Sequence, residues 1–180
     1  ALIFKEMAGI DAWPIVLNTQ DPEEIISTVK AIAPNFGGIN LEDIAAPKCF
    51  DIEKRLVDEL DIPVMHDDQH GTAIVVLAGL INAAKVVKKN FEKLRIVING
   101  AGAAGTAVAK LLHAAGIRDI VLLDRGGIIY KGRKGMNPHK AALAAITNPR
   151  NIKGDLTRAI EGADVCIGLS REGLLKPAHI

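Results

Sequence analysis

One glycine-rich turn limits the folds open to this chain more than any other stretch. The segment "NGAGAAG" spaces Gly100, Gly102 and Gly105 as Gly-x-Gly-x-x-Gly, directly after the apolar run "LRIVI" and before the alanine-rich run "TAVAKLLHAAG". Glycine turns of this spacing typically join a β-strand to a helix that packs closely on it. The sequence therefore predicts a parallel sheet with crossover helices.

The same rhythm continues on both sides of this turn. Short apolar runs alternate with helical patterns, as expected for parallel strands joined by right-handed crossovers. Strands are predicted at residues 13–19, 36–43, 62–68, 94–100, 119–124 and 164–170; helices are predicted at residues 21–34, 51–60, 72–89, 101–116, 138–146 and 156–163. We therefore expect an α/β fold whose domain boundary falls inside the long helix and separates residues 1–72 from residues 73–180.

The glycine turn and the acid after the next strand predict a dinucleotide site. Gly100 permits the tight turn, Gly102 lets a pyrophosphate approach the backbone, and Gly105 lets the helix pack on the strand. The first helical N–H groups, at Ala103 and Ala104, meet the phosphate charge. Asp124 ends the next predicted strand, 19 residues after Gly105, where an acid accepts hydrogen bonds from the adenosine ribose. The alternative is a glycine turn used only for packing.

The same acid predicts a preference between NAD and NADP. Asp124 favours NAD because its charge repels a 2′-phosphate. Arg125 follows directly, and further basic residues lie close behind in the sequence: Lys131, Arg133 and Lys134. These side chains could hold a 2′-phosphate instead, so NADP remains open.

Two pairs of acids follow two predicted strands of the amino-terminal half. Glu42 and Asp43 end the strand at residues 36–43, and Asp67 and Asp68 end the strand at residues 62–68. Ligands bind at the carboxyl edge of parallel sheets. Converging carboxylates repel one another unless a cation is present, and an all-oxygen ligand set suits Mg²⁺ or Mn²⁺.

These acids also have purely structural interpretations. Strand-end acids can simply be solvated, and Asp67 or Asp68 could cap the helix that follows. His66 and His70 flank the second pair, and histidines beside carboxylates can bind zinc. These two histidines, however, straddle a strand end and a turn and do not share one helix face.

Composition excludes several other classes of function. The net charge of +1 gives no basis for binding nucleic acid or a membrane surface. The apolar run "GTAIVVLAGLI" is shorter than the roughly 20 residues of a membrane span. Cys49 and Cys166 lie far apart among apolar neighbours and are predicted to be buried free thiols. Free thiols and the absence of a visible signal peptide indicate a reducing, cytoplasmic location.

Several blocks together resemble one enzyme family over essentially the whole chain. The blocks "FGGINLEDIAAPKCFDIEKRL", "IPVMHDDQHGTAIVVLAGLINA", "INGAGAAGTAVAKLL" and "DRGGIIYKGR" resemble the malic enzymes in their short prokaryotic form. The resemblance implies oxidative decarboxylation of L-malate to pyruvate and CO₂ with NAD or NADP and Mg²⁺ or Mn²⁺. It also implies a Rossmann-like NAD(P)-binding domain, preceded by part of a smaller α/β domain for malate and metal, and a homo-oligomer.

The resemblance assigns roles to individual residues. It implies that Glu42, Asp43 and Asp68 are the metal ligands and that Asp67 supports the general base by hydrogen bonding. The dinucleotide would lie on the glycine turn and on Asp124 and Arg125. Ser170, at the end of the strand "VCIGLS", would line the nicotinamide side.

The resemblance also implies that the principal catalytic residues of the family lie outside residues 1–180. The family's catalytic lysine and tyrosine would precede Ala1, and Lys5 and Tyr130 do not occupy their motif positions. Residues 1–180 alone are therefore not expected to turn over malate. Two alternatives stay open: a non-catalytic dinucleotide-binding module and a metal-free dehydrogenase.

Overall fold

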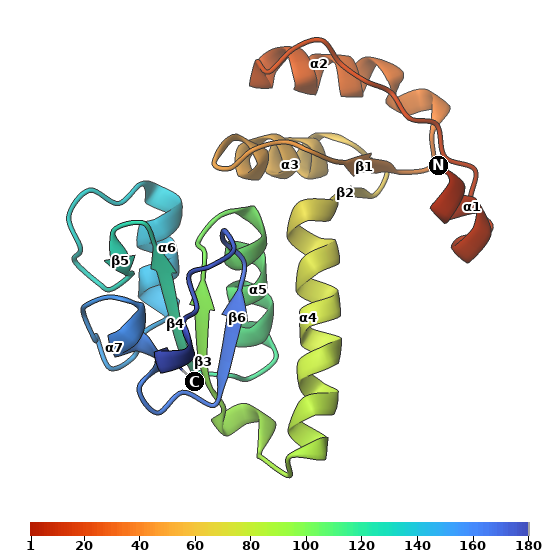
Figure 1. Cartoon of the computed structure of the whole chain (residues 1–180). Helices are drawn as coiled ribbons and strands as arrows, with labels where there is room; N and C mark the ends of the chain where they lie inside the picture. The colour runs from red at the N-terminus through yellow and green to blue at the C-terminus, as the bar shows by residue number, and fades with distance from the viewer. Residues whose placement is uncertain (180) are drawn as a thin grey trace.

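The chain forms two separate β-sheets connected by one long helix (Figure 1). The computed structural model describes residues 1–179. The smaller sheet pairs β1 (Ile39–Leu41) with β2 (Val64–His66) in parallel, with Leu41 opposite His66. Helices α2 (Pro22–Ile32) and α3 (Lys48–Glu59) pack with it around Ile26, Ile52 and Leu56.

The larger sheet has the strand order β5-β4-β3-β6. Strands β3 (Arg95–Asn99), β4 (Asp119–Asp124) and β6 (Val165–Gly168) are parallel, and the short β5 (Gly127–Ile128) pairs antiparallel with β4. From β3 the chain first adds β4 on one side and later adds β6 on the other. The strand order thus reverses at β3, and such a switch point opens a crevice for ligands at the carboxyl ends of the strands.

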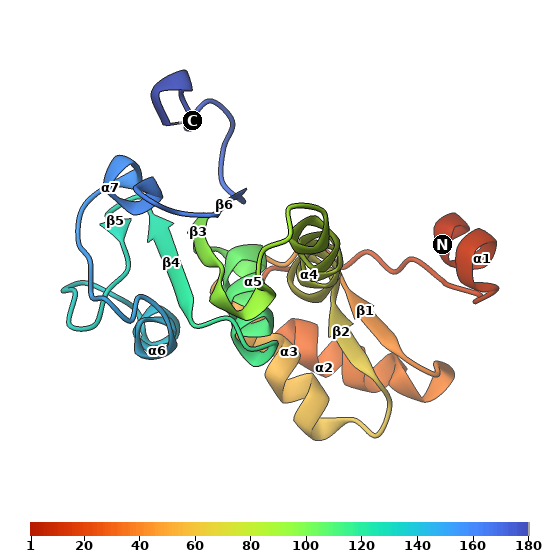
Figure 2. The same ribbon diagram turned by 90° about the horizontal axis from the view of Figure 1, so that it is seen from below.

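Helices cover both faces of the larger sheet. On β3, Ile96 and Ile98 face α4 (Asp67–Val86), α5 (Ala103–Ala114) and α6 (Pro138–Ile146). Val97 points to the opposite face and packs with Ala159 of α7 (Leu156–Ile160). This alternation follows from the two-residue period of a strand buried on both faces. Seen from below, α5 lies between the sheet and α4 (Figure 2).

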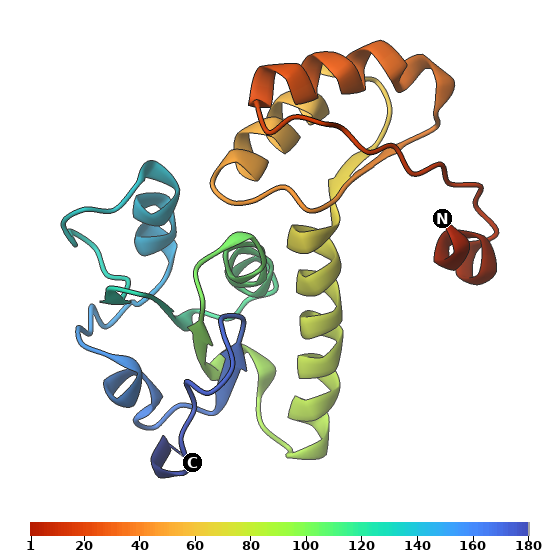
Figure 3. The ribbon, with the colours of Figure 1, turned by 45° about the horizontal axis from the view of Figure 1, so that its top comes forward.

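The long helix α4 joins the two sheets. It begins directly after β2 and contributes Ala73, Leu80 and Ala84 to the core of the larger sheet. The amino ends of α4 and α5 point the same way, toward the layer of α3 and the smaller sheet (Figures 1 and 3). The remaining helices are α1 (Leu2–Ala8) and three 3₁₀ turns, η1 (Ala33–Asn35), η2 (Phe91–Lys93) and η3 (Pro177–His179).

The structure confirms the α/β fold class and five of the six predicted strands. The strand predicted at residues 13–19 is wrong, because this stretch pairs with no other strand of residues 1–179 and leaves Val16 94% exposed. The helix predicted to start at residue 72 starts at Asp67 instead. The proposed boundary between residues 72 and 73 therefore lies inside α4. Within residues 1–179 no helix has the length and apolar composition needed to cross a membrane.

The prediction of two buried thiols holds for one cysteine. Both cysteines are free, and Cys49 is fully buried on α3. Cys166 is exposed, so its predicted burial is wrong. It pairs in register with Val97 on the face that α7 covers, but β6 is the edge strand, and the short α7 leaves this part of the face open.

Candidate functional site

The two acidic pairs lie side by side at the carboxyl edge of the smaller sheet. Because Leu41 is opposite His66, the residues after them leave the sheet at the same edge. The backbone N–H of Asp43 donates to Oδ2 of Asp68 at 3.1 Å. Asp43 adopts a positive φ of 58°, which turns the chain sharply after the strand. The structure thus places the backbone of Asp43 against the carboxylate of Asp68; the sequence predicts both residues as metal ligands.

The side chains of the predicted metal ligands do not converge on one point. Glu42 and the carboxylate of Asp43 are exposed. In the described part of the chain, no three His, Cys, Asp or Glu side chains gather closely enough to hold one ion. The donor set itself, three carboxylates at one strand edge, fits a hard cation such as Mg²⁺ or Mn²⁺. Binding such an ion requires Glu42 and Asp43 to turn toward Asp68.

Asp67 and Asp68 are the first two residues of α4. His66 occupies the N-cap position and makes no capping bond, so the alternative that these acids cap the helix is wrong. In the first turn both carboxylates meet the positive end of the helix dipole. A Cβ on Gly71 would lie 2.2 Å from Oδ1 of Asp67. Glycine at that position therefore leaves the space into which the Asp67 carboxylate folds.

A carboxylate that the sequence analysis missed supports this helix start. Glu53 of α3 accepts hydrogen bonds from the backbone N–H of His66 at 3.0 Å and from Nε2 of Gln69 at 2.9 Å. Nε2 of His70 lies 2.7 Å from the same carboxylate. His70 is thus engaged by Glu53, and His66 is fully buried with Nε2 3.5 Å from Oδ2 of Asp68. This arrangement does not join the two histidines in a zinc site.

The glycine turn has the geometry that its spacing predicts. Gly100 has a φ of +127°, and a Cβ there would lie 2.3 Å from the carbonyl oxygen of Leu169. A Cβ on Gly105 would lie 1.8 Å from the carbonyl oxygen of Gly100, so only glycine lets α5 approach β3 this closely. Gly102 caps α5 and faces open space, since a Cβ there would meet nothing within 4 Å. Its neighbour Ala103 begins the helix, whose first N–H groups have no partner within the helix.

The remaining predicted cofactor residues surround this turn. Ala104 lies in the first turn of α5. Ser170 follows β6, and its backbone nitrogen would be 3.1 Å from a Cβ on Gly100, so it borders the same crevice. Arg125 is exposed just after β4. The carboxyl ends of β3 and β6 and the start of α5 thus meet at the switch point.

Asp124 lies at the end of β4 and receives four donors. Nη1 and Nη2 of Arg133 donate to its two oxygens at 2.9 and 2.5 Å. Nζ of Lys140 donates to Oδ2 at 2.5 Å, and the N–H of Gly126 donates to Oδ1 at 2.8 Å. Burial alone would raise the pKa of Asp124, but the hydrogen bonds from Arg133, Lys140 and Gly126 outweigh it and hold that pKa well below its usual range.

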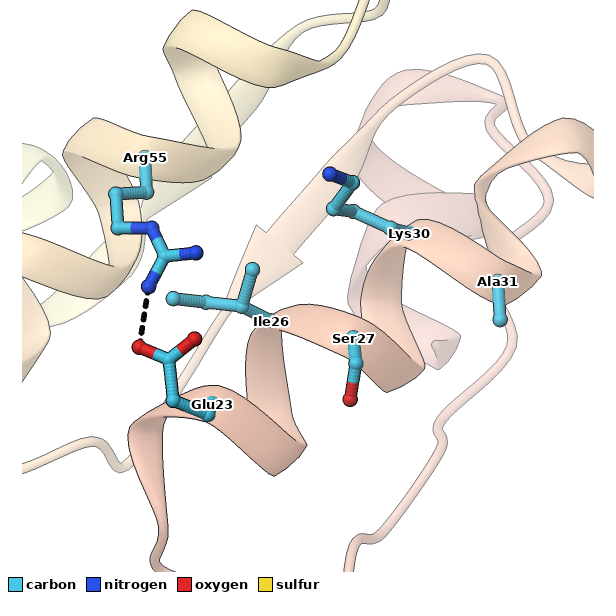
Figure 4. A pocket seen from close by; sticks show the side chains of 6 residues that line it. All are labelled: Glu23, Ile26, Ser27, Lys30, Ala31 and Arg55. Carbon is cyan, nitrogen blue, oxygen red and sulfur yellow. Dashed lines mark hydrogen bonds and ion pairs between the residues drawn. The ribbon is translucent and has the colours of Figure 1, made fainter.

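One cavity lies elsewhere, where α2 meets Arg55 of α3. It measures about 440 Å³, and Arg55 reaches across it to Glu23 (Figure 4). Its charged side chains pair with one another: Lys30 and Arg55 both contact Glu59 as well. None of the predicted site residues lines this cavity, so we place the candidate site at the two strand edges.

Comparison with known proteins assigns the family. A family described as "Malic enzyme, NAD binding domain" matches residues 69–175, and one described as "Malic enzyme, N-terminal domain" matches residues 18–57. The chain belongs to the malic enzyme family. It is 60% identical over 176 residues to an NAD-dependent malic enzyme of Geobacillus stearothermophilus, and this match covers 98% of the chain. It is 50% identical over 181 residues to an NADP-dependent malic enzyme of Halomonas elongata, covering 99% of the chain.

A solved structure supports the same assignment. The NAD-dependent malic enzyme of Thermotoga maritima superposes with a TM-score of 0.95 at 49% identity and covers 99% of this chain. The chain spans less than half the length of these relatives: 37% of the Geobacillus protein, 42% of the Halomonas protein and 48% of the Thermotoga chain.

Proposed function

We propose that this chain carries the metal edge and the dinucleotide site of an enzyme that oxidatively decarboxylates L-malate to pyruvate and CO₂. The observation that carries the proposal is the contact between Asp43 and Asp68 at one sheet edge, in a chain whose glycine turn opens α5 at another. The names of the relatives support this activity. We place the malate and metal domain at residues 1–72 and the NAD(P)-binding domain at residues 73–180.

In this proposal, residues at the carboxyl edge of the smaller sheet bind the metal, and residues at the carboxyl edge of the larger sheet bind the dinucleotide. Glu42, Asp43 and Asp68 would hold Mg²⁺ or Mn²⁺. A bound divalent cation would supply Lewis-acid stabilisation of the charge that develops as CO₂ leaves. Asp67 would hold the general base by a hydrogen bond, and Ser170 would border the nicotinamide. The open backbone at Gly102 would accept the pyrophosphate.

We propose NAD as the preferred cofactor, with Asp124 binding the adenosine ribose. NADP is the second candidate, because Arg133 and Lys140 both contact Asp124 and offset its repulsion of a 2′-phosphate. Replacing Lys140 tests its part in this choice. Lys140→Ala should raise the dissociation constant for NADP relative to that for NAD by about tenfold, as expected for losing one charge-assisted bond to phosphate. Lys85→Ala, which replaces an exposed lysine in the last turn of α4, is the control and should leave the ratio unchanged.

The metal assignment has a direct binding test. Isothermal titration of the full-length protein with Mn²⁺ should show that the double replacement of Glu42 and Asp68 by alanine abolishes tight binding. Unchanged Mn²⁺ affinity in this variant would refute the metal site and favour a metal-free dehydrogenase. The control is Glu59→Gln, since Glu59 is an acid of α3 that contacts Lys30 and Arg55 instead.

The activity itself is tested on the full-length protein. Malate-dependent formation of NADH that requires Mg²⁺ or Mn²⁺ and yields pyruvate would support the proposal. Binding of NADH without malate turnover would instead support a non-catalytic dinucleotide-binding module. We propose a cytoplasmic homo-oligomer of two or more subunits that binds neither nucleic acid nor membranes, which light scattering and fractionation can check.

A further inference from the structure

Glu53 is an acid on α3 that none of the roles proposed above uses. Its side chain is only 13% exposed, and a carboxylate this buried is costly unless several donors satisfy it. It lies one turn after Cys49, and its charge helps to raise the pKa of that buried thiol, although burial itself contributes more. A buried charge here calls for an explanation beyond surface solvation.

All the donors to Glu53 come from one junction, where β2 passes into α4. The His66 N–H binds Oε1 at 3.0 Å, the Gln69 amide binds Oε2 at 2.9 Å, and His70 Nε2 lies 2.7 Å from Oε1. His66 directly precedes Asp67 and Asp68 in the chain, and Gln69 and His70 directly follow them. One carboxylate from a different helix thus holds the backbone on both sides of the acidic pair.

We propose that Glu53 is a positioning residue that sets the direction in which Asp68 presents its carboxylate at the metal edge. This proposal rests on the proposed function, in which Asp68 is a metal ligand. Without Glu53, the His66 N–H and the buried Gln69 amide lose their acceptor, so the first turn of α4 can shift to find new partners. His66 Nε2, 3.5 Å from Oδ2 of Asp68, moves with that turn.

Loss of a group that orients a metal ligand typically weakens metal binding by about 10- to 100-fold. We therefore expect Glu53→Ala in the full-length protein to weaken Mn²⁺ binding by about tenfold or more, as measured by electron paramagnetic resonance of free Mn²⁺. Glu53→Gln keeps one acceptor oxygen for the His66 N–H but loses the bond from Gln69, so its affinity should lie between wild type and Glu53→Ala. The matched control Glu59→Gln, on the same helix, should stay within about twofold of wild type.

A second measurement separates positioning from a general loss of structure. Glu53 contacts nothing at the glycine turn, so NADH affinity by fluorescence should be equal in wild type and Glu53→Gln. The proposal is overturned by a Glu53→Ala variant that binds Mn²⁺ within twofold of wild type. It is also overturned if Glu53→Gln loses Mn²⁺ and NADH affinity in equal proportion.

A third measurement does not depend on the metal at all. If wild-type protein binds no Mn²⁺, the proposed function fails, yet amide hydrogen exchange in metal-free protein still tests Glu53. Faster exchange over residues 66–70 in Glu53→Gln, with Glu59→Gln unchanged, would support Glu53 as the residue that fixes this turn. Unchanged exchange over residues 66–70 would overturn its positioning role.

Discussion

Replacing Gly71 by alanine should separate the stability of this protein from its activity. A Cβ on Gly71 would lie 2.2 Å from Oδ1 of Asp67, whereas ordinary contacts begin near 3.4 Å. The Asp67 carboxylate must therefore move by about 1 Å, and if Asp67 holds the general base as proposed, a misplacement of that size can cost about 100-fold in rate. The helix itself gains, because alanine stabilises a helix interior by about 1 kcal/mol relative to glycine.

The measurement compares Gly71→Ala with Gly79→Ala on the same helix. A Cβ on Gly79 would meet nothing within 4 Å, so this control should share the gain in stability without touching Asp67. We expect both variants of the full-length protein to melt about 1 °C above wild type, because about 1 kcal/mol shifts the melting temperature of a protein this long by less than that of a small domain. Only Gly71→Ala should lose kcat for malate oxidation, by about 100-fold. A Gly71→Ala variant with kcat within threefold of wild type would refute the reasoning about Asp67.

Three further predictions concern the nucleotide edge and the thiols. Gly105→Ala should lower the free energy of unfolding by about 1–3 kcal/mol in urea titrations, because its Cβ would overlap a backbone carbonyl. Gly102→Ala should change stability by less than about 0.5 kcal/mol but weaken NADH binding; equal stability losses in the two variants would contradict this division of roles. Asp124→Asn should cost about 2 kcal/mol at pH 7. Because its folded pKa is depressed, the contribution of Asp124 is present above the unfolded pKa of about 3.9 and is lost as the pH falls below it. The difference from wild type should therefore shrink in urea titrations near pH 3, and a constant difference would contradict the assignment. At pH 8 a thiol reagent should modify the exposed Cys166 faster than Cys49, which should react only after unfolding, since burial, with help from the charge of Glu53, raises the Cys49 pKa to about 11; equal rates would refute this.

Local sequence signals were sufficient for most of the larger sheet. The turn at Gly100 and the apolar runs of β3 and β4 predict their elements because each signal lies within one strand–helix unit. The stretch at residues 13–19 carries similar apolar residues but forms no strand, since a strand also needs a neighbour to accept its hydrogen bonds. Whether such a neighbour exists depends on the fold as a whole.

The start of α4 shows how the packing of one side chain can hide a helix start. Asp67 and Asp68 resemble the end of a strand, and Gly71 resembles a turn residue, so the sequence predicts a start five residues too late. Gly71 nevertheless lies within the helix, and the Asp67 carboxylate occupies the space that a Cβ there would fill. Glu53 was missed for a related reason: its contacts reach 13 to 17 residues along the chain and exist only once α3 packs beside β2.

The choice of cofactor is equally hard to predict from local sequence, because we expect it to depend on how many hydrogen-bond donors Asp124 already has. A carboxylate offers about four acceptor positions, and Arg133, Lys140 and Gly126 together supply four donors. A ribose hydroxyl can therefore bind only if one donor leaves. Arg133 is held in a two-pronged pair and is 13% exposed, whereas Lys140 is 29% exposed on a flexible stem, so we expect Lys140 to be the donor that gives way. The released ammonium would then be available to pair with a 2′-phosphate. If Asp124 binds the adenosine ribose as proposed, the acid after β4 alone should not decide between NAD and NADP: we expect the preference to depend on the free energy of moving Lys140, a residue 16 positions further along the chain on α6.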